Sequence, residues 1–174
     1  MAGHAVFGIF ASRQGVEDAV AALRESDFRG SDISVLAPEN LGGFRDISSA
    51  KSTKAPEGAT AGATSGAVVG GVLGWLAAIG ALAIPGVGPF IAAGPILAAL
   101  AGAGVGSALG GVTGALVGFG LPEHDAKRYE TRLANGGILV SVHADDGDWS
   151  RRAKEILKSK GAEDISDVDG SRAA

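Results

Sequence analysis

Ten glycines in two runs, each on a strict four-residue repeat, constrain the fold of this 174-residue chain more than any other feature. The two runs are mirror images of each other about Gly88. Four residues are about one turn of an α-helix, so each run predicts a stripe without side chains along one helix face, where another helix can approach closely. If the chain reverses near Gly88, the stripes meet level by level, and we therefore expect an antiparallel helical hairpin over residues 58–121. The glycines expected to mediate helix packing and self-association are Gly58, Gly62, Gly66, Gly70, Gly74, Gly102, Gly106, Gly110, Gly114 and Gly118.

The expected turn of this hairpin lies between two apolar segments, roughly residues 66–84 and 90–117. Its residues are Pro85, Gly86, Gly88 and Pro89. Proline interrupts a helix that is already formed and favours the start of the next one. The pattern therefore predicts two helices joined by a tight uncharged turn.

The stretch from Gly58 to Pro122 contains no Asp, Glu, Lys, Arg or His. Each of its two apolar segments is long enough for a helix to cross a bilayer, which needs about 20 residues. However, the segments consist mostly of Ala and Gly, and large apolar side chains drive insertion into lipid. Two interpretations stay open: a hairpin in or on a membrane, and a water-soluble oligomer whose hairpins bury one another. In either case some partner has to cover an apolar surface larger than a soluble monomer tolerates.

The rest of the composition excludes several classes of function. A formal charge of -4 and a pI near 5.3 argue against a nucleic-acid partner. The chain has no cysteine, which excludes disulfides, thiolate metal sites and a cysteine nucleophile. Because the amino terminus lacks the pattern of a secretory signal, we expect the charged parts in the cytoplasm and the hairpin at the inner membrane, or a cytoplasmic soluble assembly as the alternative.

The flanking segments predict two β-α-β units. The first unit has a strand at residues 5–10, a helix capped by Ser12 and a strand at 33–36. A further helix, which begins at Pro122 and ends at Asn135-Gly-Gly, precedes the second unit. The second unit has a strand at 138–144, a helix capped by Asp146 or Asp148, and a short strand at 165–168.

This order predicts an α+β fold, a ferredoxin-like split β-α-β domain with an inserted Gly/Ala-rich antiparallel helical hairpin. We expect its parts in the following order: residues 1–38 as the first half of the domain, 39–57 as a linker, 58–121 as the hairpin, 122–169 as the second half, and 170–174 as a flexible tail. Because right-handed crossovers bring both halves into one sheet, the hairpin should project from the domain as a stalk.

The sequence offers no constellation for catalysis, and we expect a non-enzymatic protein without cofactor or metal. His4, His124 and His143 are far apart and show no spacing typical of a zinc site or a nucleophile–base pair. The acidic residues from Asp145 to Asp148 lack the ligand spacing of a calcium loop and are expected to form turns and caps. The glycine-rich stretch lacks the lysine of a phosphate-binding loop.

Several segments resemble a known family. They are Phe7-Gly-Ile-Phe10, Asp32-Ile-Ser-Val-Leu-Ala-Pro38, the turn Ile84-Pro-Gly-Val-Gly-Pro89, the run from Pro122 to Glu130, and Gly137-Ile-Leu-Val140. Together they resemble bacterial general (heat-induced) stress proteins over nearly the whole chain. The architecture is also similar, more distantly, to the small membrane subunit of the quinol-oxidising alternative complex III. The first resemblance implies induction under stress and association with membranes or assemblies, with no catalytic residues to transfer.

Two functions from different classes follow from these observations. The first is a stress-associated protein that self-associates through its glycine-zipper hairpin in or on the membrane, with membrane lipid as a further partner. The second is a soluble homo-oligomeric assembly protein whose hairpins pack into a shared apolar core. A third, an accessory subunit of a respiratory complex, is less favoured by the sequence because no cofactor ligands are visible.

Overall fold

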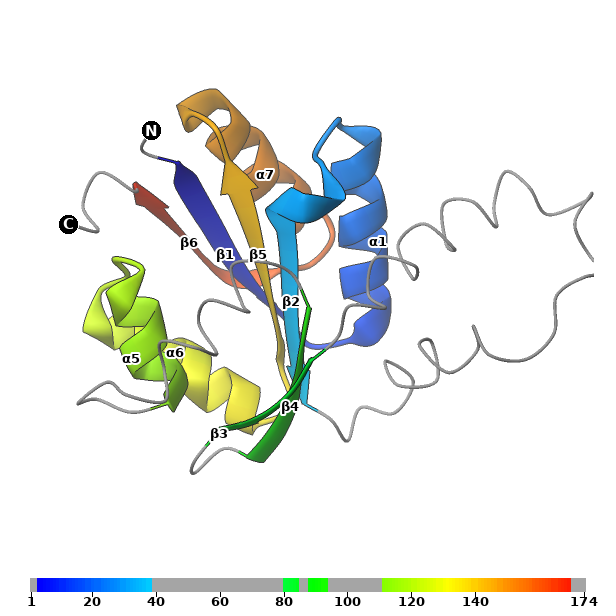
Figure 1. The fold of residues 1–174 in the computed structure, drawn as a ribbon. Helices are drawn as coiled ribbons and strands as arrows, with labels where there is room; N and C mark the ends of the chain where they lie inside the picture. Colours follow the sequence, from blue (N-terminus) through cyan, green and yellow to red (C-terminus); the bar gives the residue numbers. More distant parts are fainter. Residues whose placement is uncertain (1–2, 39–79, 85–87, 94–110, 170–174) are drawn as a thin grey trace, which may run out of the picture.

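The structure, a computed structural model, describes residues 3–38, 80–84, 88–93 and 111–169 (Figure 1). Its elements are β1 (His4–Phe10), α1 (Arg13–Glu25), a short 3-10 helix (Gly30–Asp32), β2 (Ile33–Pro38), β3 (Gly80–Ile84), β4 (Gly88–Ala93), α5 (Gly111–Gly118), α6 (Glu123–Ala134), β5 (Ile138–Ala144), α7 (Gly147–Ser159) and β6 (Glu163–Asp169). The strands form one antiparallel sheet in the order β3-β4-β2-β5-β1-β6. The protein is therefore of the α+β class, as expected.

The four strands of the two β-α-β units interleave within this sheet. β5 lies between β2 and β1, and β1 pairs on its other side with β6. This order is consistent with the ferredoxin-like pattern that the sequence predicts. It brings the two halves of the chain, separated by the long charge-free stretch, into a single sheet.

Local sequence signals account for the helix ends. The Ser12 side chain accepts a hydrogen bond from the Gly15 amide at 3.2 Å and caps α1. Of the two candidate caps for α7, Asp146 is the one used: one of its carboxylate oxygens accepts from the amides of Asp148 and Trp149, each at 2.9 Å. After α6 the chain turns at Gly136, whose φ of 91° is a conformation that favours glycine.

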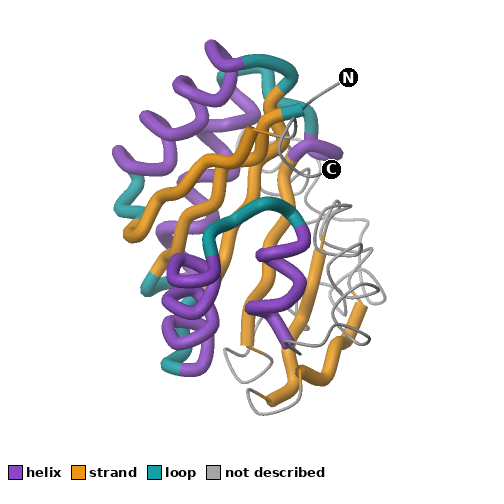
Figure 2. Tube along the Cα trace, turned by 90° about the vertical axis from the view of Figure 1, so that its left-hand side faces the viewer, coloured by secondary structure: helices purple, strands orange, loops and turns teal. Residues whose placement is uncertain are grey.

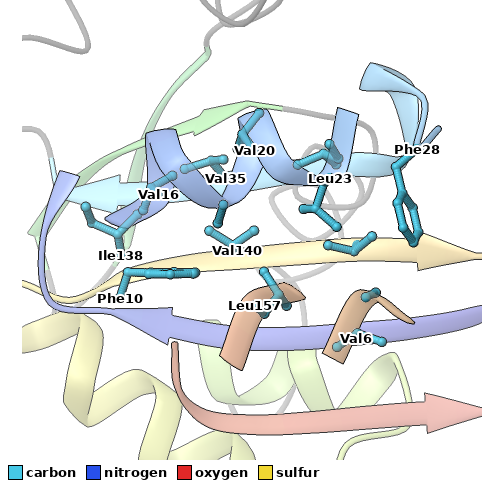
Figure 3. Packing of buried hydrophobic residues seen from close by; sticks show 14 of the residues in the cluster. Val6, Phe10, Val16, Val20, Leu23, Phe28, Val35, Ile138, Val140 and Leu157 are labelled. Atoms are coloured by element: carbon cyan, nitrogen blue, oxygen red, sulfur yellow. The ribbon is translucent and has the colours of Figure 1, made fainter. Parts of the chain in front are cut away.

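Helices cover both faces of the sheet (Figure 2). On one face, α1 and α7 pack on an entirely aliphatic and aromatic cluster whose members include Phe10, Val140 and Leu157 (Figure 3). On the other face, α5 and α6 pack on a second cluster that includes Phe7, Leu139 and Tyr129. The alternation of neighbouring β5 residues between the two clusters follows from the period of two in a strand.

The structure does not confirm the predicted helical hairpin, and it differs from the prediction next to the expected turn. The residues at 80–84 and 88–93 form two strands, β3 and β4, in place of the ends of two helices. β4 pairs with β2 from Pro38↔Phe90 to Val35↔Ala93, so it continues the domain's sheet. The β3–β4 pairing is centred on position 86, two residues before Gly88, and the chain still reverses between Ile84 and Gly88.

A physical reason for this difference lies at the edge of β2. Without β4, the amide and carbonyl groups on that side of β2 would have no partner in the sheet, and unpaired backbone groups are costly when buried. Short runs of Ala, Gly, Leu and Ile carry no periodicity that separates a helix from a strand. Tertiary pairing therefore decides the conformation of these segments. The remaining parts of the predicted hairpin, residues 58–79, 85–87 and 94–110, lie outside the described residues.

Candidate functional site

Most of the predicted self-association residues lie outside the described part of the chain. Gly114 and Gly118 are the two of the ten glycines that the structure describes, and both belong to α5. Gly114 is buried, whereas a Cβ atom at Gly118 would meet no atom within 4 Å. Of the turn residues, Gly88 and Pro89 lie in β4, and Pro85 and Gly86 lie outside the described residues. The helical conformation expected for the end of the second run is thus observed in α5.

Helix α5 is the described element in which the charge-free stretch rejoins the α/β domain. Its residues from Val112 to Leu116 are all buried, and Leu116 is fully so. A helix that is apolar on every side is stable in water only when its surroundings cover it. α5 lies beside α6, to which a short connection joins it (Figures 1 and 2), and three of its side chains belong to the core cluster under both helices.

A carboxylate from α6 holds the beginning of α5. One Glu130 side-chain oxygen, Oε2, accepts a hydrogen bond from the Thr113 amide at 2.9 Å and another from the Thr113 hydroxyl. The first amides of a helix have no partner within the helix, and a negative charge near them is favourable. Glu130 therefore acts as a cap supplied by a neighbouring helix. The sequence pattern missed this role, because the residues are 17 positions apart and neither belongs to a local capping motif.

Helix α6 is in turn fixed to β1 and the edge strand β6 through Tyr129. Its side chain is 1 % exposed, and its hydroxyl donates to the backbone carbonyl of Asp164, with the Phe7 carbonyl 3.3 Å away. These carbonyls flank the register shift between β1 and β6, where the regular ladder is interrupted. Burial is the main cause that raises the pKa of Tyr129 to about 12. The phenol therefore stays protonated and can donate at neutral pH.

Ion pairs at the surface join the same two elements. Arg128 and Arg132 of α6 contact the Asp164 carboxylate at 3.0 and 3.1 Å, and Arg132 also contacts Glu163 at 3.0 Å. Hydrogen bonds to Asp164 and Asp125 raise the pKa of Arg128. Asp164 has a φ of 50°, a conformation uncommon for residues other than glycine. The two arginines thus hold an irregular strand segment that the sequence prediction, which began the last strand at residue 165, did not include.

Two of the three histidines lie on paired strands, since His4 is opposite Ala144 and His143 is opposite Ala5, but neighbouring positions of a strand point to opposite faces of the sheet. His4 lies in β1, His124 at the start of α6 beside Asp125 at 3.3 Å, and His143 in β5 at 3.8 Å from Asp145. Within residues 3–38, 80–84, 88–93 and 111–169, no group of three side chains is placed to hold a metal ion. No helix in the described ranges has both the length and the apolar character needed to cross a bilayer.

The family comparison matches residues 4–167 to the model of the ActD subunit of alternative complex III. The chain belongs to the ActD family. The match runs through both β-α-β units and the stretch between them. No curated protein and no solved structure matches the chain.

Membership of the ActD family decides between the two resemblances seen in the sequence. It supports the similarity to alternative complex III, and the general stress protein family receives no support. ActD is a subunit of a larger complex, so protein partners are expected for this family, and an association with a membrane is consistent with it. The accessory-subunit hypothesis, less favoured by the sequence alone, gains weight accordingly.

Proposed function

We propose that the chain is a non-enzymatic structural subunit of a membrane-associated complex of the alternative complex III type. In this role the α/β domain holds the charge-free stretch in a fixed position relative to the rest of the assembly. The junction of α5 and α6 makes the attachment. Membership of the ActD family supports the role as a subunit of such a complex. The hydrogen bond between the Thr113 amide and the Glu130 carboxylate supports the attachment at the junction of α5 and α6.

The observation that carries this proposal is the double hydrogen bond between Thr113 and Glu130 at the start of a buried helix. A carboxylate seldom lies in a partly buried position without a partner, because its desolvation is costly. Here the partner is the segment through which the charge-free stretch returns to the domain. Tyr129 and the two arginines continue the attachment from α6 to β1 and β6. An unbroken series of contacts therefore connects the returning chain with the sheet.

The test compares two glutamates of the same helix. Glu130→Ala removes the acceptor of Thr113, whereas Glu123→Ala removes an exposed carboxylate that pairs with Lys127 at 2.6 Å. Each variant is expressed in place of the native chain, and its copurification with the other subunits of the complex from detergent-solubilised membranes is measured. We expect Glu130→Ala to lower the recovered fraction and Glu123→Ala to leave it unchanged. Equal recovery of both variants with the native chain would contradict the proposed attachment.

Self-association through the glycine runs is a further part of the proposal. Substituting Leu for Gly66 and Gly110 together adds bulk to both glycine runs. We expect a smaller oligomer or a weaker membrane association, measured by mass and by ultracentrifugal fractionation. Unchanged size and unchanged partition would refute the glycine packing. A defined large particle that stays in solution without detergent would favour the soluble homo-oligomer over a membrane hairpin.

A further inference from the structure

Helix α7 carries a surplus of positive charge in a chain that is negative overall. From Gly147 to Lys160 five residues are cationic and two are acidic, whereas the whole chain has a formal charge of -4. The cationic residues are Arg151, Arg152, Lys154, Lys158 and Lys160, and the acidic residues are Asp148 and Glu155. About four to eight lysines and arginines on an amphipathic helix are typical of a segment that binds anionic lipid headgroups.

The sheet occupies the apolar side of this helix. Ala153 and Leu157 are fully buried in the cluster between α7 and the sheet. A helix that lies in a membrane interface inserts its apolar side among the lipids, and α7 cannot do so without leaving the sheet. The side that it offers to an external surface is therefore the charged one.

Two of the five cations are already paired with acids of the domain. Arg151 contacts Asp148 at 2.9 Å, and Lys154 contacts Asp167 at 2.6 Å. The other three are exposed and have no acidic partner within the described part of the chain: Arg152, Lys158 and Lys160. The charge of these three side chains is available to an external anion.

The surroundings of the last turn of α7 do not neutralise its lysines. The start of α1 lies beside it, since the Lys160 carbonyl oxygen is 3.5 Å from the position of a Cβ atom at Gly15, and the first turn of α1 has no acidic residue. Glu163, which begins β6, already contacts Arg132 at 3.0 Å. This end of α7 is therefore a cationic part of the surface.

The last turn of α7 also lies at a particular end of the sheet. β1 and β2 both run antiparallel to β5, so they end where β5 begins, at the lower end in Figure 1. β6 is antiparallel to β1 and begins at that end too, so α7, which connects β5 with β6, has its last turn there. β4 begins beside the end of β2, which places the reversal between β3 and β4 at the same end. The cationic turn and the reversal within the charge-free stretch thus share one end of the domain.

We propose that the exposed side of α7, with Lys158 and Lys160 at its end, binds the anionic headgroups of the membrane with which the complex associates. The proposal rests on the membrane association included in the proposed function. Anionic lipids give a bilayer surface a negative potential that attracts cations within about one Debye length, roughly 8–10 Å at physiological salt. A charge-free stretch and a cationic surface at one end of the domain match the two layers of a bilayer, its hydrocarbon core and its headgroups. An acidic protein surface would match only the cations.

The test uses the full-length chain and vesicles of two compositions, phosphatidylcholine alone and phosphatidylcholine mixed with phosphatidylglycerol. Vesicle flotation at low salt gives the bound fraction for each composition. The double variant Lys158→Gln/Lys160→Gln removes two cations that lack a partner. Its matched control, Arg24→Gln/Lys127→Gln, removes the same charge from exposed side chains in the last turn of α1 and on α6. Lys158→Arg/Lys160→Arg keeps both charges.

We expect the native chain and the control to bind the phosphatidylglycerol vesicles several-fold better than the phosphatidylcholine vesicles, and added salt to remove the difference. The glutamine variant should lose most of this preference, and the arginine variant should keep it. Circular dichroism checks folding, and the two single glutamine variants carry the test if the double variant does not fold. A native chain without the preference, or an equal preference in the glutamine variant and the control, would overturn the proposal.

Copurification with the other subunits separates this proposal from the proposed function. A glutamine variant that keeps the lipid preference but recovers fewer subunits would overturn the assignment to lipid, because α7 would then contact an acidic protein. A native chain that prefers phosphatidylglycerol but recovers no other subunit would overturn the proposed function and leave the lipid contact of α7 standing.

Discussion

The two faces of the sheet are stabilised in different ways. The face under α1 and α7 is held by burial of apolar side chains, including Phe10, Leu23 and Leu157, all 1 % exposed or less. The face under α5 and α6 also has an apolar cluster, but specific polar contacts of Tyr129 and Glu130 fix its helices. Burial is non-directional, whereas hydrogen bonds require one geometry. Both faces thus bury apolar side chains, and the second adds directional contacts at the helix where the charge-free stretch rejoins the domain.

The largest effect on stability is expected on the apolar face. Leu157→Ala deletes a fully buried side chain and leaves a cavity between α7 and the sheet. Such substitutions cost about 2–5 kcal/mol. We expect a loss of this size in the free energy of unfolding, measured by chemical denaturation. A loss below about 1 kcal/mol would mean that this face is not the main source of stability.

On the polar face, the stability of the protein is expected to depend on alkaline pH through Tyr129. The folded-state pKa of about 12 lies above the ordinary value of 10, so the contribution of the phenol is complete below pH 10. It is lost progressively as the pH rises from 10 through 12, and it amounts to at most about 2–3 kcal/mol. Tyr129→Phe should remove this alkaline dependence and lower stability at neutral pH, because the Asp164 carbonyl loses its donor.

Tyr129 is the one tyrosine in the chain, which makes its titration directly observable. The ultraviolet absorbance of the phenolate can be followed in the folded and in the denatured protein. A folded-state midpoint at or below the denatured one would contradict burial of the hydroxyl against the two carbonyls.

A smaller effect is expected at the cap of α7. Asp146→Ala removes the acceptor of two amides and should cost about 1 kcal/mol. Asp148→Ala is the control, since that side chain is exposed and pairs only with Arg151 in the described contacts. Thermal denaturation should rank the two variants in this order. Equal melting temperatures of the two variants would contradict the role of the Asp146 side chain as the cap of α7.

The smallest effect is expected from the surface ion pairs. Arg132→Gln removes contacts to Asp164 and Glu163 from a side chain that is about half exposed, and exposed pairs contribute about 0–1 kcal/mol. We expect a change in stability that fades as salt is added, because salt screens such pairs. A large, salt-independent loss would show that this arginine has a role in packing.

The sequence predicted the elements whose signals are local or periodic. The Ser12 cap of α1 and the Asn135-Gly136 stop of α6 were both visible in it, and the structure confirms them. It could not predict β3 and β4, since their conformation depends on the free edge of β2 and not on their own residues. It also missed Glu130, because a cap donated across 17 residues leaves no local pattern. The glycine runs before position 111 stay a prediction.

The central claim is that Glu130 attaches the returning chain to the domain, and amide hydrogen exchange at Thr113 tests it most directly. In the native chain the Thr113 amide should exchange slowly, because its hydrogen is donated to the Glu130 carboxylate. In Glu130→Ala the exchange of residues 112–116 should accelerate, while the β5 amides, in the centre of the sheet, keep their protection. Glu123→Ala should change neither. Exchange at Thr113 that is equally fast with and without the Glu130 carboxylate would contradict the attachment.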